Sequence, residues 1–162
     1  MTSRAAPHAR NDFQAVTDAV LVASRALVAV AARSIATVDT EVTLPQYRAL
    51  VVLHTRGPQN AGALATSLGI HPSTTTRLCD RLVAKKLIRR SPAPNSRREV
   101  VLTLTTRGHD LVRKVTDARR AEITRIVERI PTELRPTMST AFITFANAAG
   151  EPTDETSPLG WS

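Results

Sequence analysis

Short hydroxyl side chains and arginines gather in one segment of the chain, between Pro72 and Lys86. At helical spacing they share one outer face, whose expected DNA-contacting members are Ser73, Thr74, Thr76, Arg77 and Arg81. Hydroxyl groups let a helix approach base edges and phosphates closely, and a guanidinium can bind guanine with two parallel hydrogen bonds. The pattern indicates a helix that enters the major groove of DNA, although the same composition also suits a plain solvated face.

A second basic cluster follows directly. Four arginines, Arg89, Arg90, Arg97 and Arg98, flank a turn at residues 92–96. A narrow minor groove concentrates negative potential and attracts an inserted arginine. Alone, this cluster would suit any basic surface loop, but its place after the candidate recognition helix favours contact with DNA.

The elements that must position these side chains form a recognisable order. A short helix is expected at residues 61–68, followed by the turn Gly69-Ile70-His71 and by a second helix that starts at Pro72. Residues 87–91 and 100–105 then form two short strands around the turn, because apolar and polar residues alternate at 100–105. A preceding helix at residues 44–54 ends at Gly57-Pro58. The order is that of a winged helix-turn-helix.

Long apolar stripes flank this module. One follows a helix from Phe13 at heptad-like spacing, with Val16, Val20, Ala23, Leu27 and Val30; a second contains Leu21, Val28 and Ile35. A helix at residues 107–130 and a last helix after Pro131, with Leu134, Met138, Phe142 and Phe145 expected to face inward, add further apolar surface. One winged module cannot cover all of it, so we expect a homodimer.

The predicted fold is therefore mainly α with a small β-hairpin: a winged helix-turn-helix carrying a helical dimerisation stem. We expect a mobile arm at residues 1–10, one domain at residues 11–149 and a flexible tail at residues 150–162. Within the domain, residues 11–38 and 106–149 are assigned to dimerisation and residues 44–105 to the winged module.

Composition limits the partners and the compartment. The formal net charge of +8 favours a polyanion, either nucleic acid or an acidic membrane surface. Arg25 and Arg33 interrupt the most apolar stretch, so we expect no transmembrane helix and no membrane partner. Asp12 and Asp18 occupy what would be the basic leader of a signal peptide. A soluble, cytoplasmic protein is expected.

Catalytic and metal chemistry find no support in the residues. His8, His54, His71 and His109 have no metal-ligand spacing, and the chain has neither a Gly-rich phosphate loop nor a nucleophile with an adjacent base. We expect no enzyme activity, metal or cofactor. Cys79 is the single cysteine, so a buried structural thiol is favoured over a redox switch.

Three segments, LPQYRALVVL (44–53), HPSTTTRLCDRL (71–82) and SRREVVLTLTTRG (96–108), closely resemble the multiple antibiotic resistance regulator (MarR) family. The resemblance extends over residues 13–148. It implies a triangular dimer with two winged modules on a pseudo-palindromic DNA site. It also implies a repressor that leaves DNA when a phenolic or other small ligand binds, or when a cysteine is oxidised.

The resemblance also implies roles for single residues. Ser73, Thr74, Thr76 and Arg77 would contact bases in the major groove, and Arg98 would enter the minor groove. The family usually has an aspartate where this chain has Ser96, and that aspartate helps to hold the wing arginine. The family's ligand cleft borders the second helix, where Tyr47 and His54 are candidates for lining it, against the alternative that they only pack.

Two other functions fit the same fold. A constitutive or architectural DNA-binding protein would lack an effector, and a winged helix used for protein contact would not need the arginine-rich hairpin.

Overall fold

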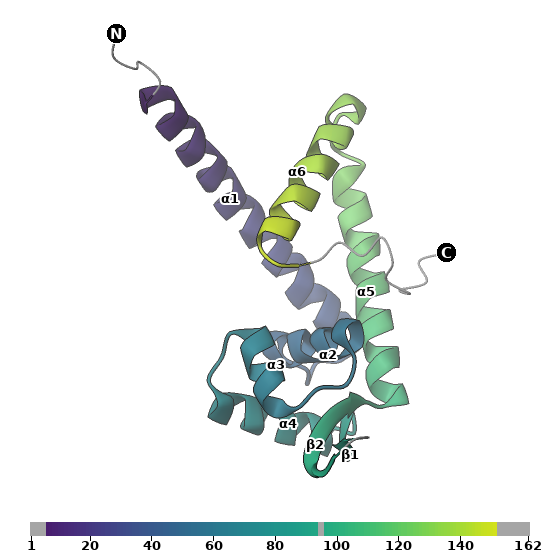
Figure 1. Ribbon diagram of the computed structural model, residues 1–162. Coiled ribbons are helices and arrows are strands. Elements are labelled where there is room, and N and C mark those ends of the chain that lie inside the picture. The colour runs from purple at the N-terminus through teal and green to yellow at the C-terminus, as the bar shows by residue number, and fades with distance from the viewer. Residues whose placement is uncertain (1–5, 94–95, 152–162) are drawn as a thin grey trace.

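A computed structural model describes residues 6–93 and 96–151, with side chains placed except at 6–11 and 96–98. Figure 1 shows a winged module at one end of the molecule and long helices that rise from it. The elements in chain order are α1 (Ala6–Val38), α2 (Leu44–Arg56), α3 (Ala61–Leu68), α4 (Pro72–Ala84), β1 (Ile88–Ala93), β2 (Ser96–Leu104), α5 (Thr106–Val127), the 3-10 turn η1 (Thr132–Leu134) and α6 (Arg135–Ala148). The predicted fold class is confirmed.

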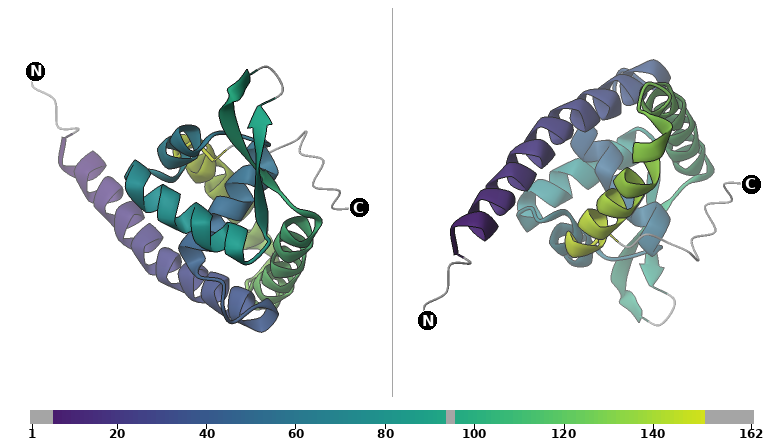
Figure 2. Two further views of the ribbon diagram at one scale, coloured as in Figure 1. Left: turned by 90° about the horizontal axis from the view of Figure 1, so that it is seen from below. Right: turned by 90° about the horizontal axis from the view of Figure 1, so that it is seen from above.

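The winged module has one continuous core. Helix α2 packs on α3 and α5, α3 packs on α4, and the hairpin packs on α2 and α4. The largest fully buried side chains of this core include Leu50, Leu64, Leu82, Leu87 and Leu102. This packing holds the base of the hairpin against α4, so the two basic clusters lie at the same end of the molecule (Figures 1 and 2).

Local chemistry sets the ends of the helices that form the helix-turn-helix. Asn60 caps α3 by accepting a hydrogen bond from the backbone N–H of Ala63 at 2.8 Å. Gly69 closes α3 in the left-handed conformation, with φ of 64°, which glycine adopts without a Cβ penalty. His71 then caps α4, and Pro72 occupies its first turn, where a missing N–H costs nothing. The predicted turn at residues 69–71 lies between α3 and α4 as expected.

The hairpin reaches further than its alternation pattern predicts. Strands β1 and β2 pair antiparallel from Ile88↔Leu104 to Pro92↔Val100, and the register shifts between Pro92 and Ala93. Pro92 and Ser96 therefore belong to the strands, not to the predicted turn at residues 92–96. A proline is tolerated there because both strands of a two-stranded sheet are edges.

The junction between the hairpin and α5 is tightly packed. Thr105 caps α5: its Oγ1 accepts from the Gly108 N–H at 3.1 Å and donates to the Lys86 carbonyl at 2.7 Å. A Cβ at Gly108 would lie 2.2 Å from the carbonyl oxygen of Leu87. That contact is with backbone, which cannot move aside as a flexible side chain would.

We therefore expect Gly108→Ala to lower the free energy of unfolding by about 1–3 kcal/mol or more, as overpacking does. Urea unfolding followed by circular dichroism measures the loss. Gly62→Ala is the matched control, since its Cβ would meet only the Asn60 side chain at 3.5 Å and alanine favours a helix interior. Equal stability of the Gly108→Ala variant and the wild type would contradict the steric argument.

Helix α1 differs from the sequence expectation in two ways. It begins at Ala6, so residues 6–10 of the expected arm are helical; Pro7 in its first turn is compatible with this start. Residues 1–5 lie outside the described part. Residues Asp12–Val38 are also long and apolar enough to cross a membrane by length and composition, so the expectation that Arg25 and Arg33 prevent this is wrong. Two charged residues within a stretch of this length are not enough to exclude a membrane span.

Much of the apolar surface of the long helices is uncovered. Only 6% of the most apolar window of α1 is buried, and no residue of α6 is. Leu134 and Phe145, which were expected to face inward, are 54% and 52% exposed. One face of α1 and the facing side of α6 border an apolar groove of about 380 Å³, lined by Val16, Ala19, Val20, Ala23, Ser24, Leu27, Ala141, Phe142 and Phe145. A single chain therefore leaves these stripes unsatisfied.

Candidate nucleic-acid interface

Helix α4 has two sharply different faces. Thr75, Leu78, Cys79 and Leu82 are buried against the rest of the module. The opposite face is exposed and carries all five predicted contact residues of the helix, Ser73, Thr74, Thr76, Arg77 and Arg81. This division follows from the helical period, since the buried positions recur at intervals of three and four residues.

The first turn of α4 is ordered by its own side chains. The Nδ1 atom of His71 accepts a hydrogen bond from the Ser73 N–H at 3.3 Å and lies 2.9 Å from its Oγ. Thr76 Oγ1 donates to the Pro72 carbonyl at 3.1 Å. Within the described residues, the side chains of Thr74, Arg77 and Arg81 have no hydrogen bond or ion pair. These three remain available to a partner outside the chain.

The wing places its arginines differently from one another. Arg89 and Arg90 on β1 are both exposed, but Arg90 donates to Asp80 Oδ1 on α4 at 2.6 Å. Arg90 is thus held by Asp80 within the protein. The sequence did not predict this contact, because no motif or spacing singled out Asp80. The backbone of Arg97 and Arg98 lies on β2, while their side chains and that of Ser96 lie outside the described residues.

Cys79 is completely buried on the inner face of α4. Burial raises the pKa of its thiol, while the nearby Arg90 lowers it by less. The reactive thiolate is therefore disfavoured at neutral pH, as expected for a thiol that serves packing.

Tyr47 lies at the seam between α2 and α5, where the structure brings together residues that sequence spacing could not. Its side chain is 3% exposed, and its hydroxyl lies 3.1 Å from Thr116 Oγ1. Since Thr116 already donates to the Val112 carbonyl, the tyrosine is the donor. The Arg119 guanidinium stacks 5.1 Å above the Tyr47 ring, and its Nε is buried without a hydrogen-bond partner. Most buried polar groups have a hydrogen-bond partner, so this unpaired donor marks the seam as unusual.

His54 contacts a second histidine that lies 55 residues further along the chain. The Nδ1 atoms of His54 on α2 and His109 on α5 are 3.1 Å apart. One ring nitrogen must donate and the other accept, so at least one of the two rings is neutral. Burial, and then the neighbouring His109, lower the pKa of His54 below its usual value of 6.5. Within the described ranges no third ligand joins the pair, since no three His, Cys, Asp or Glu side chains gather as a metal site.

The pH dependence of stability follows from this pair. A histidine whose pKa is lowered in the folded state stabilises the fold fully above the unfolded pKa of 6.5, and the contribution is lost as the pH falls from there towards the folded pKa. We expect the urea midpoint of the wild type to fall between about pH 7.5 and 5.5 by more than that of His54→Gln. Parallel midpoints for both proteins across this range would contradict the assignment.

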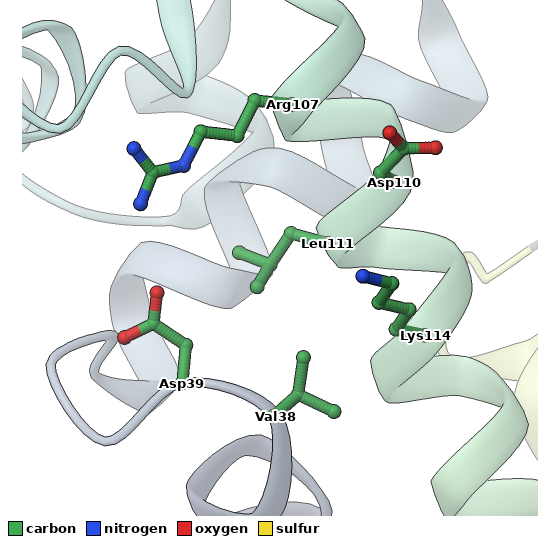
Figure 3. Close-up of a pocket in the computed structure, with 6 residues that line it drawn as sticks. All are labelled: Val38, Asp39, Arg107, Asp110, Leu111 and Lys114. Carbon is green, nitrogen blue, oxygen red and sulfur yellow. The ribbon is translucent and has the colours of Figure 1, made fainter.

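A shallow polar cleft of about 330 Å³ opens where the end of α1 meets the start of α5. Figure 3 shows Leu111 in its middle, with Arg107 and Asp39 on one side and the Lys114 amino group on the other. Asp110, at the edge, pairs with Arg113 at 2.8 Å. Because both signs of charge line this cleft, it lacks the uniform positive lining of an anion site.

The geometry defines a winged helix-turn-helix protein, and the comparisons agree. Residues 42–100 match the MarR family model. RV1404 from Mycobacterium tuberculosis has 51% sequence identity, with 86% of this chain and 95% of that chain covered and a TM-score of 0.81. The chain thus belongs to the MarR family of helix-turn-helix transcriptional regulators, which are not enzymes.

Two further relatives are informative. The transcriptional repressor NicR of Pseudomonas putida is 31% identical over 46% of this chain and 47% of its own length. This chain thus spans about half the length of the curated relatives it matches. A structure of a Staphylococcus aureus MepR mutant bound to an oligodeoxyribonucleotide shares the fold, with 21% identity, coverage of 82% of this chain and 97% of that chain, and a TM-score of 0.60.

Proposed function

We propose that this chain is a homodimeric, cytoplasmic repressor that binds a pseudo-palindromic DNA site and leaves it when a small effector binds. The observation that carries the DNA-binding part is the exposed face of α4. It presents hydroxyls and unpaired arginines next to a basic hairpin at the same end of the molecule. A MepR mutant of the same fold has been seen bound to an oligodeoxyribonucleotide, and NicR is a repressor.

Dimerisation is supported by the apolar groove between α1 and α6. A second copy would cover the groove and the exposed apolar residues of both helices. A membrane could also cover α1, but the end of this helix packs against the rest of the protein: Val30, Ser34 and Ile35 are buried, and Arg33 pairs with Glu122 of α5. A second copy covers the apolar face without withdrawing this end from the fold.

The salt dependence of the affinity for DNA tests the proposed binding, and an arginine variant of the wing tests the part that the wing plays in it. We expect the logarithm of the affinity for DNA to fall linearly with the logarithm of the salt concentration. We also expect the protein to select, from a pool of random duplexes, sequences that it binds more tightly than the rest of the pool. Arg98→Ala should weaken binding and flatten this slope by about one unit per subunit, more on A·T-rich flanks, where a narrow groove attracts arginine. Fluorescence anisotropy with A·T-flanked and G·C-flanked duplexes measures both. An unchanged slope on both duplexes would show that Arg98 does not enter the groove.

Effector release is proposed for the Tyr47 seam. Tyr47 is only 3% exposed, so a phenolic carboxylate would enter by opening the seam, and it would then accept a hydrogen bond from the unpartnered Nε of Arg119. Titrating salicylate against the protein–DNA complex tests this, with Arg119→Gln as the matched variant. A switch requires different affinities for the ligand in the free and DNA-bound states. DNA affinity that is independent of salicylate and of other small aromatic acids would favour the constitutive, architectural alternative.

A further inference from the structure

Both strands of the wing are tied to the helix-turn-helix by side chains. On β1, Arg90 donates to Asp80 of α4 at 2.6 Å. On β2, Glu99 Oε1 accepts from Asn60 Nδ2 at 2.7 Å, and Asn60 is also the N-cap of α3. Further from the hairpin tip, the Leu102 N–H donates to the Gln59 carbonyl at 2.9 Å. The wing base is therefore anchored to α3 and to α4 at once.

We propose that Asp80 and Glu99 are positioning residues that set the angle of the wing relative to α4, and so decide whether the wing arginines meet the groove beside the half-site. This inference rests on the proposed DNA-binding function. Asp80 acts through Arg90, and Glu99 acts through Asn60; neither needs to touch DNA itself.

Because these two contacts lie near the base of the hairpin, a small rotation there causes a large displacement towards its tip. Arg98 lies four residues beyond Leu102 on β2, about 13 Å at the rise of a strand. A rotation of about 10° at the base would move the Arg98 backbone by roughly 2 Å, enough to break a hydrogen bond. The ladder between β1 and β2 cannot prevent this, because both of its strands belong to the hairpin and would rotate with it.

Fold stability does not explain the two contacts. The side chains of Arg90 and Asp80 are 43% and 54% exposed, and exposed ion pairs add little to stability. The hydrogen bond between Asn60 and Glu99 is exposed as well. Removing either contact should therefore leave the protein folded. The two contacts restrict the direction in which the wing points relative to α4. That direction matters only when the wing meets a partner.

Charge and positioning predict opposite signs, which makes the proposal testable. A carboxylate near phosphates repels them, so removing Asp80 or Glu99 should tighten binding to any DNA if only charge matters. If they position the wing, removal should weaken binding to cognate DNA, because the wing must then be ordered during binding.

The experiment uses a duplex that the wild type selects from a pool of random sequences of about 30 base pairs, long enough for two half-sites one helical turn apart. Asp80→Ala and Glu99→Ala should bind it about three- to ten-fold more weakly, the range expected when one or two side chains must be ordered. Hydroxyl-radical footprinting should show protection lost beside each half-site and kept within it. Glu99→Gln should behave as the wild type, since its side-chain carbonyl still accepts from Asn60. Asp117→Asn, an exposed change on α5, controls for charge.

Equal or tighter binding by the alanine variants with a wild-type footprint would overturn the positioning role and leave the proposed function intact. Uniform weakening on selected and random duplexes would also overturn it, because a wing angle affects only the selected site. If the wild type enriches no sequence from the pool, the proposed function falls and the positioning role falls with it. Thermal melting of each variant confirms that the compared proteins are folded.

Discussion

Leu27→Asp should leave the protein monomeric and remove its high-affinity binding to DNA. Leu27 lines the groove between α1 and α6 and is 45% exposed in the single chain. If a second copy covers it, the change places a carboxylate in an apolar interface, which costs several kcal/mol without a partner. A two-fold symmetric interface carries the substitution twice, so the cost doubles.

Sedimentation velocity at micromolar concentration measures the outcome. Ala32→Asp is the matched control, because the same charge then lies on an exposed position of α1 that does not line the groove. It should sediment as a dimer. A stable folded monomer of the wild type would refute the dimer, and flotation of that monomer with lipid vesicles would assign the apolar face of α1 to a membrane.

Arg77→Ala should cost the specific complex about 1–3 kcal/mol per half-site, up to roughly a hundred-fold in affinity for each, and relax the preference at one base pair. Arg77 is exposed on the outer face of α4, where it lies one turn beyond the exposed Ser73. A bidentate guanidinium discriminates guanine from other bases, so the loss should be concentrated on the selected sequence.

Anisotropy titrations with selected and random duplexes separate base contact from phosphate contact. Arg125→Ala, on the exposed surface of α5, removes one positive charge away from α4 and should change both affinities little. An equal loss on both duplexes after Arg77→Ala would make Arg77 a phosphate contact and would remove it from the set of base-reading residues.

The helix-turn-helix could be predicted from the sequence because its signals are local. Gly69 ends α3, Pro72 begins α4, and the spacing of Leu78 and Leu82 separates a buried face from an exposed one. The hairpin was predicted for the same reason, although its strands run closer to the tip because a two-stranded sheet tolerates Pro92. Such features depend on the backbone preferences of neighbouring residues, which a single chain segment carries by itself.

The contacts that position and tune the site were decided by the tertiary structure. Asp80 meets Arg90, Asn60 meets Glu99, and His54 meets His109 only after the elements have packed. The last of these pairs is separated by 55 residues, so no local spacing could indicate it. Periodicity likewise identified the apolar stripe of α1, but it could not show that one chain leaves it uncovered, since burial depends on which surfaces the whole fold brings together.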